Sequence, residues 1–159
     1  MMANKKHMNV AGATNEEFNN EAMPTISISG EQDNYGIITS CNLQASSIFG
    51  YNKTEVINRR VNVLMSQVFS KFHDAFLENY LNSGESAIIG KNKQRMVFGK
   101  NKSNYILPIY LSIRAVQSII QGTQFICIIR QEKNFKNVAY MLTTPDGTID
   151  AMSSSCINL

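Results

Sequence analysis

The sequence predicts an α+β domain in which helices gather on one face of an antiparallel sheet. Two strand-like stretches come first, helical stretches occupy the middle, and three strand-like stretches follow. Turn-prone residues join neighbouring strands at both ends, and short connections of this kind favour antiparallel pairing. Strands and helices that are grouped along the chain, rather than strictly alternating, are typical of the α+β class.

The first two strands are predicted from alternation with period two. Isoleucine alternates with Ser or Thr in Thr25–Ser29, and the turn-prone segment 30–36 separates this stretch from Ile37–Thr39. A strand, a turn containing Gly and Asn, and a second strand predict a hairpin.

Three helical segments are predicted next. The first two, Leu43–Phe49 and Lys53–Asn58, are short and must be held by packing. The third runs from about Ser70 to Asn82, with Gly84 placed to end it.

The long helix is predicted to be amphipathic, and His73 falls within its apolar stripe. The stripe consists of Phe69, Phe76 and Tyr80, flanked by Phe72 and Leu77. The opposite side carries Lys71, Asp74, Glu78 and Asn82. Phe72 and Phe76, with Phe98 and Phe125, either line a small-molecule cavity or fill the core.

Three strands are predicted after the long helix, at Arg95–Gly99, Tyr105–Val116 and Phe125–Ile129. One face of the longest strand is formed by Leu107, Ile109, Leu111 and Ile113. Its second face bears Ile106, Pro108 and Tyr110, a partly apolar patch that is predicted to seat a partner or a second copy. The last strand is apolar on both faces, which is typical of a central strand.

Both ends of the chain are predicted to lie outside the main domain, which is placed at 24–134. Residues 1–23 are polar and lack periodicity, so they are interpreted as a flexible leader or a flanking helix. Residues 135–159 are interpreted as a linker and the start of a second, truncated copy of the same unit. Asp146–Ser153 resembles Tyr35–Asn42 in its Gly-x-Ile step and in the small polar residues beyond it.

Composition and charge exclude several classes of protein. The net charge is +3, and the basic residues form no concentrated stripe, so nucleic acid is not an expected partner. No stretch approaches the roughly 18–20 apolar residues of a membrane span, so no membrane contact by this segment is expected. The cysteines Cys41, Cys127 and Cys156 are odd in number and far apart, which favours a reduced, cytoplasmic compartment. Membrane attachment of a larger parent protein stays open.

Catalysis is not predicted for this chain. His73 and Asp74 are neighbours on a helix, about 100° apart around its axis, so they do not form the hydrogen-bonded pair of a triad. No Gly-rich phosphate loop, metal-ligand cluster or nucleophile motif occurs in the sequence.

Several short segments between about Thr25 and Lys133 carry a resemblance to a known family. They include Gly36-Ile37-Ile38, Ile48-Phe49-Gly50-Tyr51, Val61 to Met65, Phe72-His73-Asp74-Ala75-Phe76-Leu77, Ile88-Ile89-Gly90 and Phe125 to Arg130. In this order and spacing they resemble a PAS domain. The resemblance implies the PAS fold, a five-stranded antiparallel sheet with short helices on one face, and a sensing or regulatory role. The C-terminal copy would then be a second PAS repeat.

Within this family, the chain resembles the haem-binding PAS domain of bacterial oxygen-sensor histidine kinases. The resemblance implies that His73 is the axial ligand of the haem iron and that Arg95 contacts bound oxygen or a propionate. It also implies that the distal side of the haem is lined by Ile88, Leu111 and Ile113. The chain departs from that branch in the longer segment before Arg95 and in Asn79, which stands where the branch has an Arg.

Two functional interpretations therefore stay open at this stage. One is a non-catalytic regulatory PAS domain of a larger signalling protein, which works through a homodimer or through another domain of its parent protein. The other is a haem-based gas sensor, for which His73 must be more than a core histidine. A flavin cofactor is disfavoured, because Asn62-Val63-Leu64-Met65 stands where the flavin branch has Asn-Cys-Arg-Phe.

Overall fold

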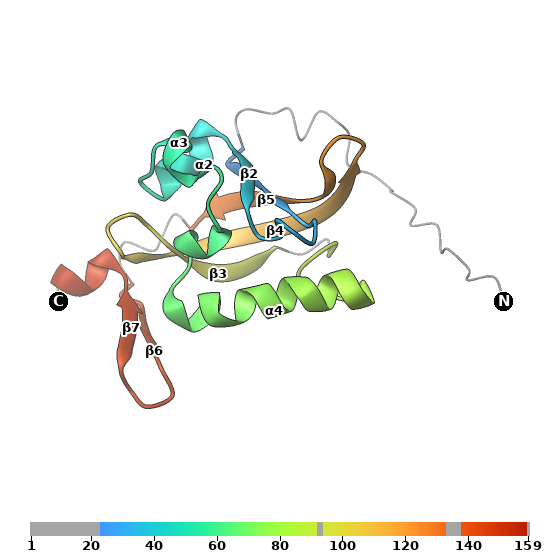
Figure 1. The fold of residues 1–159 in the computed structure, drawn as a ribbon. Coiled ribbons are helices and arrows are strands. Elements are labelled where there is room, and N and C mark those ends of the chain that lie inside the picture. Colours follow the sequence, from blue (N-terminus) through green and yellow to red (C-terminus); the bar gives the residue numbers. More distant parts are fainter. Residues whose placement is uncertain (1–22, 92–93, 133–137, 159) are drawn as a thin grey trace.

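A five-stranded antiparallel sheet with helices on one face forms the body of the computed structural model, which describes residues 23–91, 94–132 and 138–158 (Figure 1). The strand order is β2-β1-β5-β4-β3. The strands are β1 (Thr25–Ser29), β2 (Ile38–Cys41), β3 (Arg95–Lys100), β4 (Ile106–Ser118) and β5 (Gly122–Gln131). The helices are α2 (Leu43–Ile48), α3 (Lys53–Val56), the 3-10 helix η1 (Val61–Leu64) and α4 (Gln67–Ser83). The predicted α+β class is confirmed.

The centre of the sheet is β5, as the two-sided apolar pattern of Phe125–Ile129 predicts. It pairs antiparallel with β1 on one side and with β4 on the other. β4 and β5 both extend beyond the predicted bounds and close as a hairpin in which Ser118 pairs with Gly122. Gly122 has φ +65°, a left-handed conformation that glycine adopts without strain.

The short helices are positioned by polar caps and packing. Asn42 precedes α2, and its Oδ1 accepts hydrogen bonds from the amides of Ala45 at 2.9 Å and Thr25 at 3.1 Å. One side chain thus ties the start of α2 to the start of β1. α3 begins after Asn52 with a capping box, in which Glu55 accepts from the Asn52 amide at 2.8 Å.

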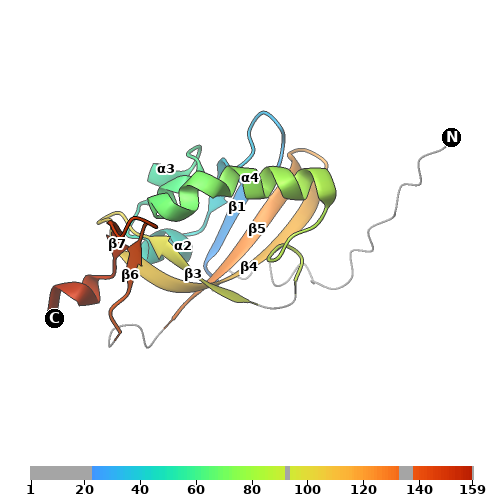
Figure 2. The same ribbon diagram turned by 90° about the horizontal axis from the view of Figure 1, so that it is seen from below.

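The long helix α4 crosses the strands on one face of the sheet (Figure 2). It starts at Gln67, three residues before the predicted start, and ends at Gly84, whose φ of +71° and N–H bond to Tyr80 O form a left-handed cap. Its inward side is set by Leu77, which is buried, and by Tyr80, whose ring meets Phe125 edge-on at 5.5 Å between centroids.

The predicted apolar stripe of α4 is wrong for its three phenylalanines, although His73, Leu77 and Tyr80 do face the core. Phe69, Phe72 and Phe76 are 41%, 57% and 66% exposed, and they point away from the sheet side of the helix. The cause is the contact of Leu77 and Tyr80 with the core, which turns the three phenylalanines outward. We call Phe69, Phe72 and Phe76 the α4 stripe.

The predicted interaction patch on β4 is wrong for two of its three residues. Ile106 and Pro108 are buried, and the ring of Tyr140 covers part of this face. The Glu132 amide donates to Pro108 O at 3.2 Å, and Tyr140 packs against Phe98, the cross-strand partner of Pro108. Tyr110 is half-buried, with the guanidinium of Arg130 4.2 Å above its ring.

A second, two-stranded sheet follows the main domain. It pairs β6 (Met141–Thr143) with β7 (Ile149–Met152), and the 3-10 helix η3 (Ser154–Asn158) comes next. We call β6–β7 the C-terminal hairpin. It touches the main domain where the Val68 amide, in the first turn of α4, donates to Asp150 Oδ2 at 3.2 Å, and where the rings of Tyr140 and Phe98 lie 5.2 Å apart.

Two sequence-based interpretations fall largely on parts of the chain outside the described residues. The predicted leader at 1–23 is one, apart from Met23, and residues 133–137 around the predicted domain boundary are the other. Within the described ranges, no helix combines the length and the apolar character needed to span a bilayer.

Candidate functional site: a cavity beneath the long helix

A small apolar cavity of about 90 Å³ lies between α4 and the sheet. Its walls come from β1, η1, α4 and the three strands β3 to β5. Leu77, Ile89 and Phe125 are among the apolar side chains that line it, and His73 is the only ionisable side chain there apart from Cys127. A neutral or weakly polar molecule of a few atoms matches this lining.

His73 brings one imidazole to the cavity wall. Its side chain is 19% exposed, and its Nδ1 is buried without a hydrogen-bond partner among the described residues. Burial lowers the pKa of His73, and the neighbouring Asp74 carboxylate opposes that effect only in part. The ring is therefore neutral at pH 7, the state in which a histidine nitrogen can accept a hydrogen bond.

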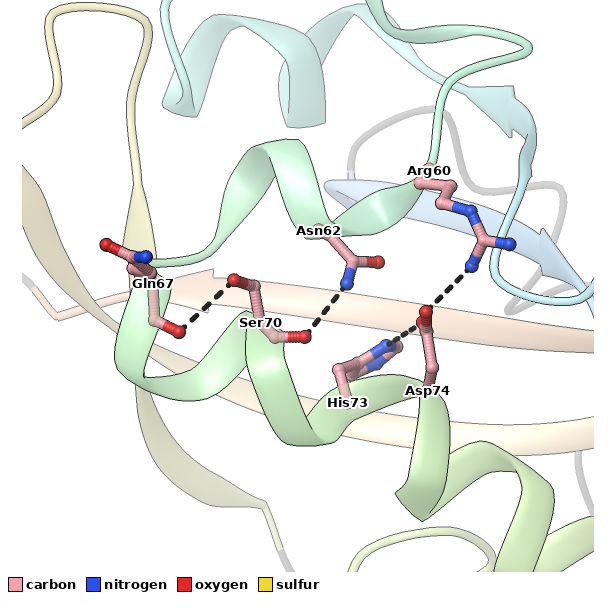
Figure 3. A network of polar contacts seen from close by, with 6 residues as sticks. All are labelled: Arg60, Asn62, Gln67, Ser70, His73 and Asp74. Atoms are coloured by element: carbon pink, nitrogen blue, oxygen red, sulfur yellow. Dashed lines mark hydrogen bonds and ion pairs between the residues drawn. The ribbon is translucent and has the colours of Figure 1, made fainter.

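Asp74 lies between Arg60 and His73 and contacts both, but its hydrogen bond goes to Arg60 (Figure 3). Its Oδ2 accepts from Arg60 Nη1 at 2.8 Å, whereas its Oδ1 lies 3.9 Å from His73 Nδ1, beyond hydrogen-bond distance. Arg60 in turn lies 5.7 Å above the ring of Tyr35. His73 and Asp74 thus do not form the oriented pair that general-base catalysis by a triad requires.

A second polar contact holds η1 against the start of α4. Asn62 Nδ2 donates to Ser70 O at 3.0 Å, and Ser70 Oγ donates to Gln67 O at 3.3 Å (Figure 3). Asn62 Oδ1 and Ser66 Oγ are buried and, like His73 Nδ1, have no hydrogen-bond partner in the part of the chain that the structure describes. Orphaned acceptors of this kind are costly unless water or a ligand satisfies them.

The structure brings together some of the residues that the resemblance implies for a haem site and leaves others apart. His73, Leu111 and Ile113 line the cavity. Ile88 does not line it, and its neighbour Ile89 does, because Ile89 forms a parallel bridge with Ile113. Arg95, at the exposed start of β3, is not among the lining residues.

The cavity does not fit a haem. Pockets for drug-sized ligands and cofactors have volumes of about 300–1,000 Å³, and this one has about 90 Å³. Enclosing a macrocycle would require α4 to move off the sheet. Among the described residues, no group of three or more His, Cys, Asp or Glu side chains is placed to hold a metal ion.

Cys127 is the one thiol on the cavity wall, and it is unsuited to nucleophilic chemistry. Complete burial raises its pKa to about 12. Since the thiolate is the reactive form, this sulfur stays a protonated, apolar group at neutral pH.

The sequence matches the PAS domain family over residues 24–132, and the chain therefore belongs to this family. Its relatives include the sensor protein FixL of Bradyrhizobium diazoefficiens, 34% identical over 86 residues, and a probable serine/threonine-protein kinase of Dictyostelium discoideum, 32% identical over 82 residues. These matches cover 54% and 52% of this chain, but only 17% of FixL and 5% of the kinase. The chain is thus similar to a small part of each relative.

Solved structures agree on the fold. A light-oxygen-voltage domain studied with a flavin analogue superposes with a TM-score of 0.55 at 13% identity, covering 75% of this chain and 84% of that one. The PAS domain of the fruit-fly ELK potassium channel gives 0.53 at 12% identity, covering 74% and 92%. A domain of a sensory box histidine kinase/response regulator from Geobacter sulfurreducens gives 0.53 at 17% identity, covering 74% and 90%.

Sequence reasoning missed two features of the site. The first is the role of Leu77 in setting which side of α4 faces the cavity, although its spacing of four from His73 is a helical signal. The second is Ile89, which no local pattern separates from Ile88, since both are apolar and only the bridge to Ile113 selects one of them.

The neutral state of His73 makes folding stability depend on pH. Because its pKa is lowered in the folded chain, the unfolded chain binds more protons once the pH falls below about 6.5, the ordinary value for His. The stabilising effect of a neutral His73 is complete above that pH and is lost as the pH falls towards the folded-state pKa. The slope is at most about 1.4 kcal/mol per pH unit.

Urea unfolding of the wild-type chain and of His73→Gln at pH 7.5, 6.5 and 5.5 measures this effect. We expect the wild type to lose stability relative to the variant as the pH falls, while contributions from other groups cancel in the difference. A difference that stays constant over this range would contradict burial of a neutral imidazole at position 73.

Proposed function

We propose that this PAS domain is a non-catalytic regulatory module of a larger cytoplasmic signalling protein, and that it docks to a second copy of itself through the α4 stripe. The observation that carries this proposal is the exposure of Phe69, Phe72 and Phe76 on one side of a single helix. A contiguous set of exposed aromatic side chains on a folded domain is typical of an interaction surface.

The spacing of the α4 stripe suits a helix-to-helix contact. Positions 69, 72 and 76 are separated by three and four residues, so their rings form one ridge along the helix axis. Two such ridges related by a twofold axis present the same apolar surface to each other, which is the arrangement of an isologous dimer. Phenylalanines at the centre of the contact would supply most of its free energy.

The cavity borders the same helix, and this arrangement supports a regulatory role. His73 and Leu77 face the cavity, whereas the α4 stripe faces outward. A small molecule that binds more tightly to one position of α4 than to another would shift the population of the docking-competent state by that difference in affinity. Ligand sensing and docking would then share one helix.

Substitution of Phe76 by Asp is expected to weaken self-association by at least about tenfold, because it places a charge in the middle of the apolar contact. Sedimentation equilibrium over a range of protein concentrations measures the dissociation constant. The matched control is Asn82→Asp, which adds the same charge at an exposed position of α4 outside the stripe and should leave that constant unchanged. A wild-type chain that stays monomeric, or a Phe76→Asp chain that dimerises like the wild type, would contradict the proposal.

Haem binding stays a prediction that this geometry does not favour. The similarity to FixL and the position of His73 on the cavity wall support it. The volume of the cavity and the exposure of Arg95 oppose it.

A further inference from the structure

The C-terminal hairpin reproduces the strand register of the first hairpin of the domain. In the first hairpin the pairs are Ile26 with Cys41, Ser27 with Ser40, and Ile28 with Ile38. In the C-terminal hairpin they are Met141 with Met152, Leu142 with Ala151, and Thr143 with Ile149. In both hairpins the register shifts after the second pair, so that Thr39 and Asp150 are the bulged residues.

The open ends of the two hairpins are closed by the same pair of hydrogen bonds. The Asn42 amide donates to Thr25 O, and the Thr25 amide donates to Asn42 Oδ1, both at 3.1 Å. In the C-terminal hairpin the Ser153 amide donates to Tyr140 O at 2.8 Å, and the Tyr140 amide donates to Ser153 Oγ at 2.9 Å. A helical segment begins directly afterwards in each case, α2 at Leu43 and η3 at Ser154.

The turn ends of the two hairpins also agree. The Ser29 amide donates to Ile37 O at 2.8 Å, and the Thr144 amide donates to Thr148 O at the same distance. A glycine with positive φ precedes each acceptor, Gly36 at +79° and Gly147 at +87°. The two hairpins differ mainly in the length of the turn that joins their strands, and turns tolerate changes in length.

Two core positions of the first hairpin are matched by exposed apolar residues in the second, whereas the polar Thr143 stands at the position of Ile28. Ile26 and Ile38 are 2% and 0% exposed, whereas Met141 and Ile149, which occupy the same positions of the register, are 52% and 48% exposed. At these two positions the second hairpin carries apolar side chains that the described part of the chain leaves uncovered.

One edge of β6 has no strand beside it in the described part of the chain. β1 pairs with β2 on one edge and with β5 on the other, whereas β6 pairs with β7 alone. The amides of Tyr140 and Thr144 are directed to the β7 side. In an antiparallel ladder the intervening residues, Met141 and Thr143, direct their amides to the opposite, open edge.

We infer that the C-terminal hairpin is the opening hairpin of a second PAS domain. The polypeptide that continues beyond Leu159 supplies the strand that pairs with the open edge of β6, in the manner of β5, and the side chains that cover Met141 and Ile149. This inference is independent of the α4 stripe and of any ligand in the cavity.

Hydrogen exchange compares this chain with its natural polypeptide extended by about 100 residues, a typical domain length. We expect the Met141 and Thr143 amides to exchange at least about 100-fold more slowly in the longer polypeptide, because they become bonded within a folded sheet. The amides of Ile26 and Ile28 should exchange at the same rate in both chains.

A buried-charge variant provides a second readout. Ile149→Asp should leave the thermal transition of the 159-residue chain unchanged, since the side chain is exposed there, and should abolish a separate second-domain transition in the longer polypeptide. Ile38→Asp, the matching substitution in the first hairpin, should unfold the first domain in both chains. A natural reading frame that stops at Leu159, or an Ile149→Asp variant without effect on the longer polypeptide, would overturn the inference. So would protection that rises with the concentration of the 159-residue chain, because that result would assign the open edge to a second copy.

Discussion

Replacement of Phe125 by Ala is expected to lower the free energy of unfolding by about 3–5 kcal/mol, the usual range for loss of a buried aromatic ring. Phe125 is fully buried on the central strand, between its cross-strand partners Ile28 and Ala115. Its ring also receives the edge of Tyr80 from α4 at 5.5 Å. Because the ring already borders a cavity, its removal enlarges an existing void that the neighbouring side chains cannot close.

The matched control for Phe125→Ala is Phe72→Ala, the same chemical change at a side chain that is 57% exposed. At protein concentrations at which the chain is monomeric, urea unfolding should register a loss of less than about 1 kcal/mol for the control. Equal losses for the two variants would contradict the assignment of Phe125 to the core and of Phe72 to the surface.

Replacement of Gly99 by Ala is expected to destabilise the domain by about 1–3 kcal/mol, the cost of overpacking. Elsewhere in a strand this change would favour folding by roughly 0.5–1 kcal/mol, because Ala loses less conformational entropy than Gly. Here a Cβ would lie 2.6 Å from Cε1 of Phe49 and 3.3 Å from Cδ1 of Ile109. Phe49 is buried, so its ring has little room to move.

A double-mutant cycle with Phe49→Leu isolates the contact between Gly99 and Phe49. A smaller side chain at position 49 gives the new methyl group space, so Gly99→Ala should cost less in that background than in the wild type. Denaturant unfolding of the four chains gives the coupling free energy. Additive effects would show that the loss in Gly99→Ala arises elsewhere.

The strands and the C-terminal end of α4 could be predicted because their signals are local. Alternation in Thr25–Ser29 and the position of Gly84 each depend on residues within a few places in the sequence. The bounds of β1 agree with the prediction, and Gly84 ends α4 as a left-handed cap.

Which surfaces are covered could not be predicted, because covering residues come from distant parts of the chain. Alternation correctly placed Ile106 and Pro108 on the second face of β4, but Tyr140, which comes from beyond β5, covers part of this face. Likewise, periodicity correctly indicated an amphipathic α4, and packing on Phe125 decided which apolar residues face inward. The sheet that selects Leu77 and Tyr80 lies outside the helix sequence.

One part of the candidate site, the position of His73, could be predicted because the helical pattern that places it is local. His73 lies on α4 and faces the sheet, as its helical position indicates. Arg95 and Ile88 were placed by analogy of spacing, whereas the bridge of Ile89 to Ile113 determines which of the two isoleucines lines the cavity, and Arg95 lies at the exposed start of β3. The unpartnered Nδ1 of His73 was not accessible to sequence reasoning at all.

The hydrogen bond from the Val68 amide to Asp150 Oδ2 couples the main domain to the C-terminal hairpin. Among the described residues, the side chain of Ser66, which precedes α4, makes no cap, and a carboxylate from β7 accepts from one of the free amides at the positive end of this helix. Farther along the same helix, His73 and Leu77 form a wall of the cavity. Free-energy coupling between two sites is reciprocal. Suppose that a ligand in the cavity displaces α4 and lowers the equilibrium constant for the Val68–Asp150 hydrogen bond by some factor. Formation of that hydrogen bond must then lower the affinity of the cavity for the ligand by the same factor.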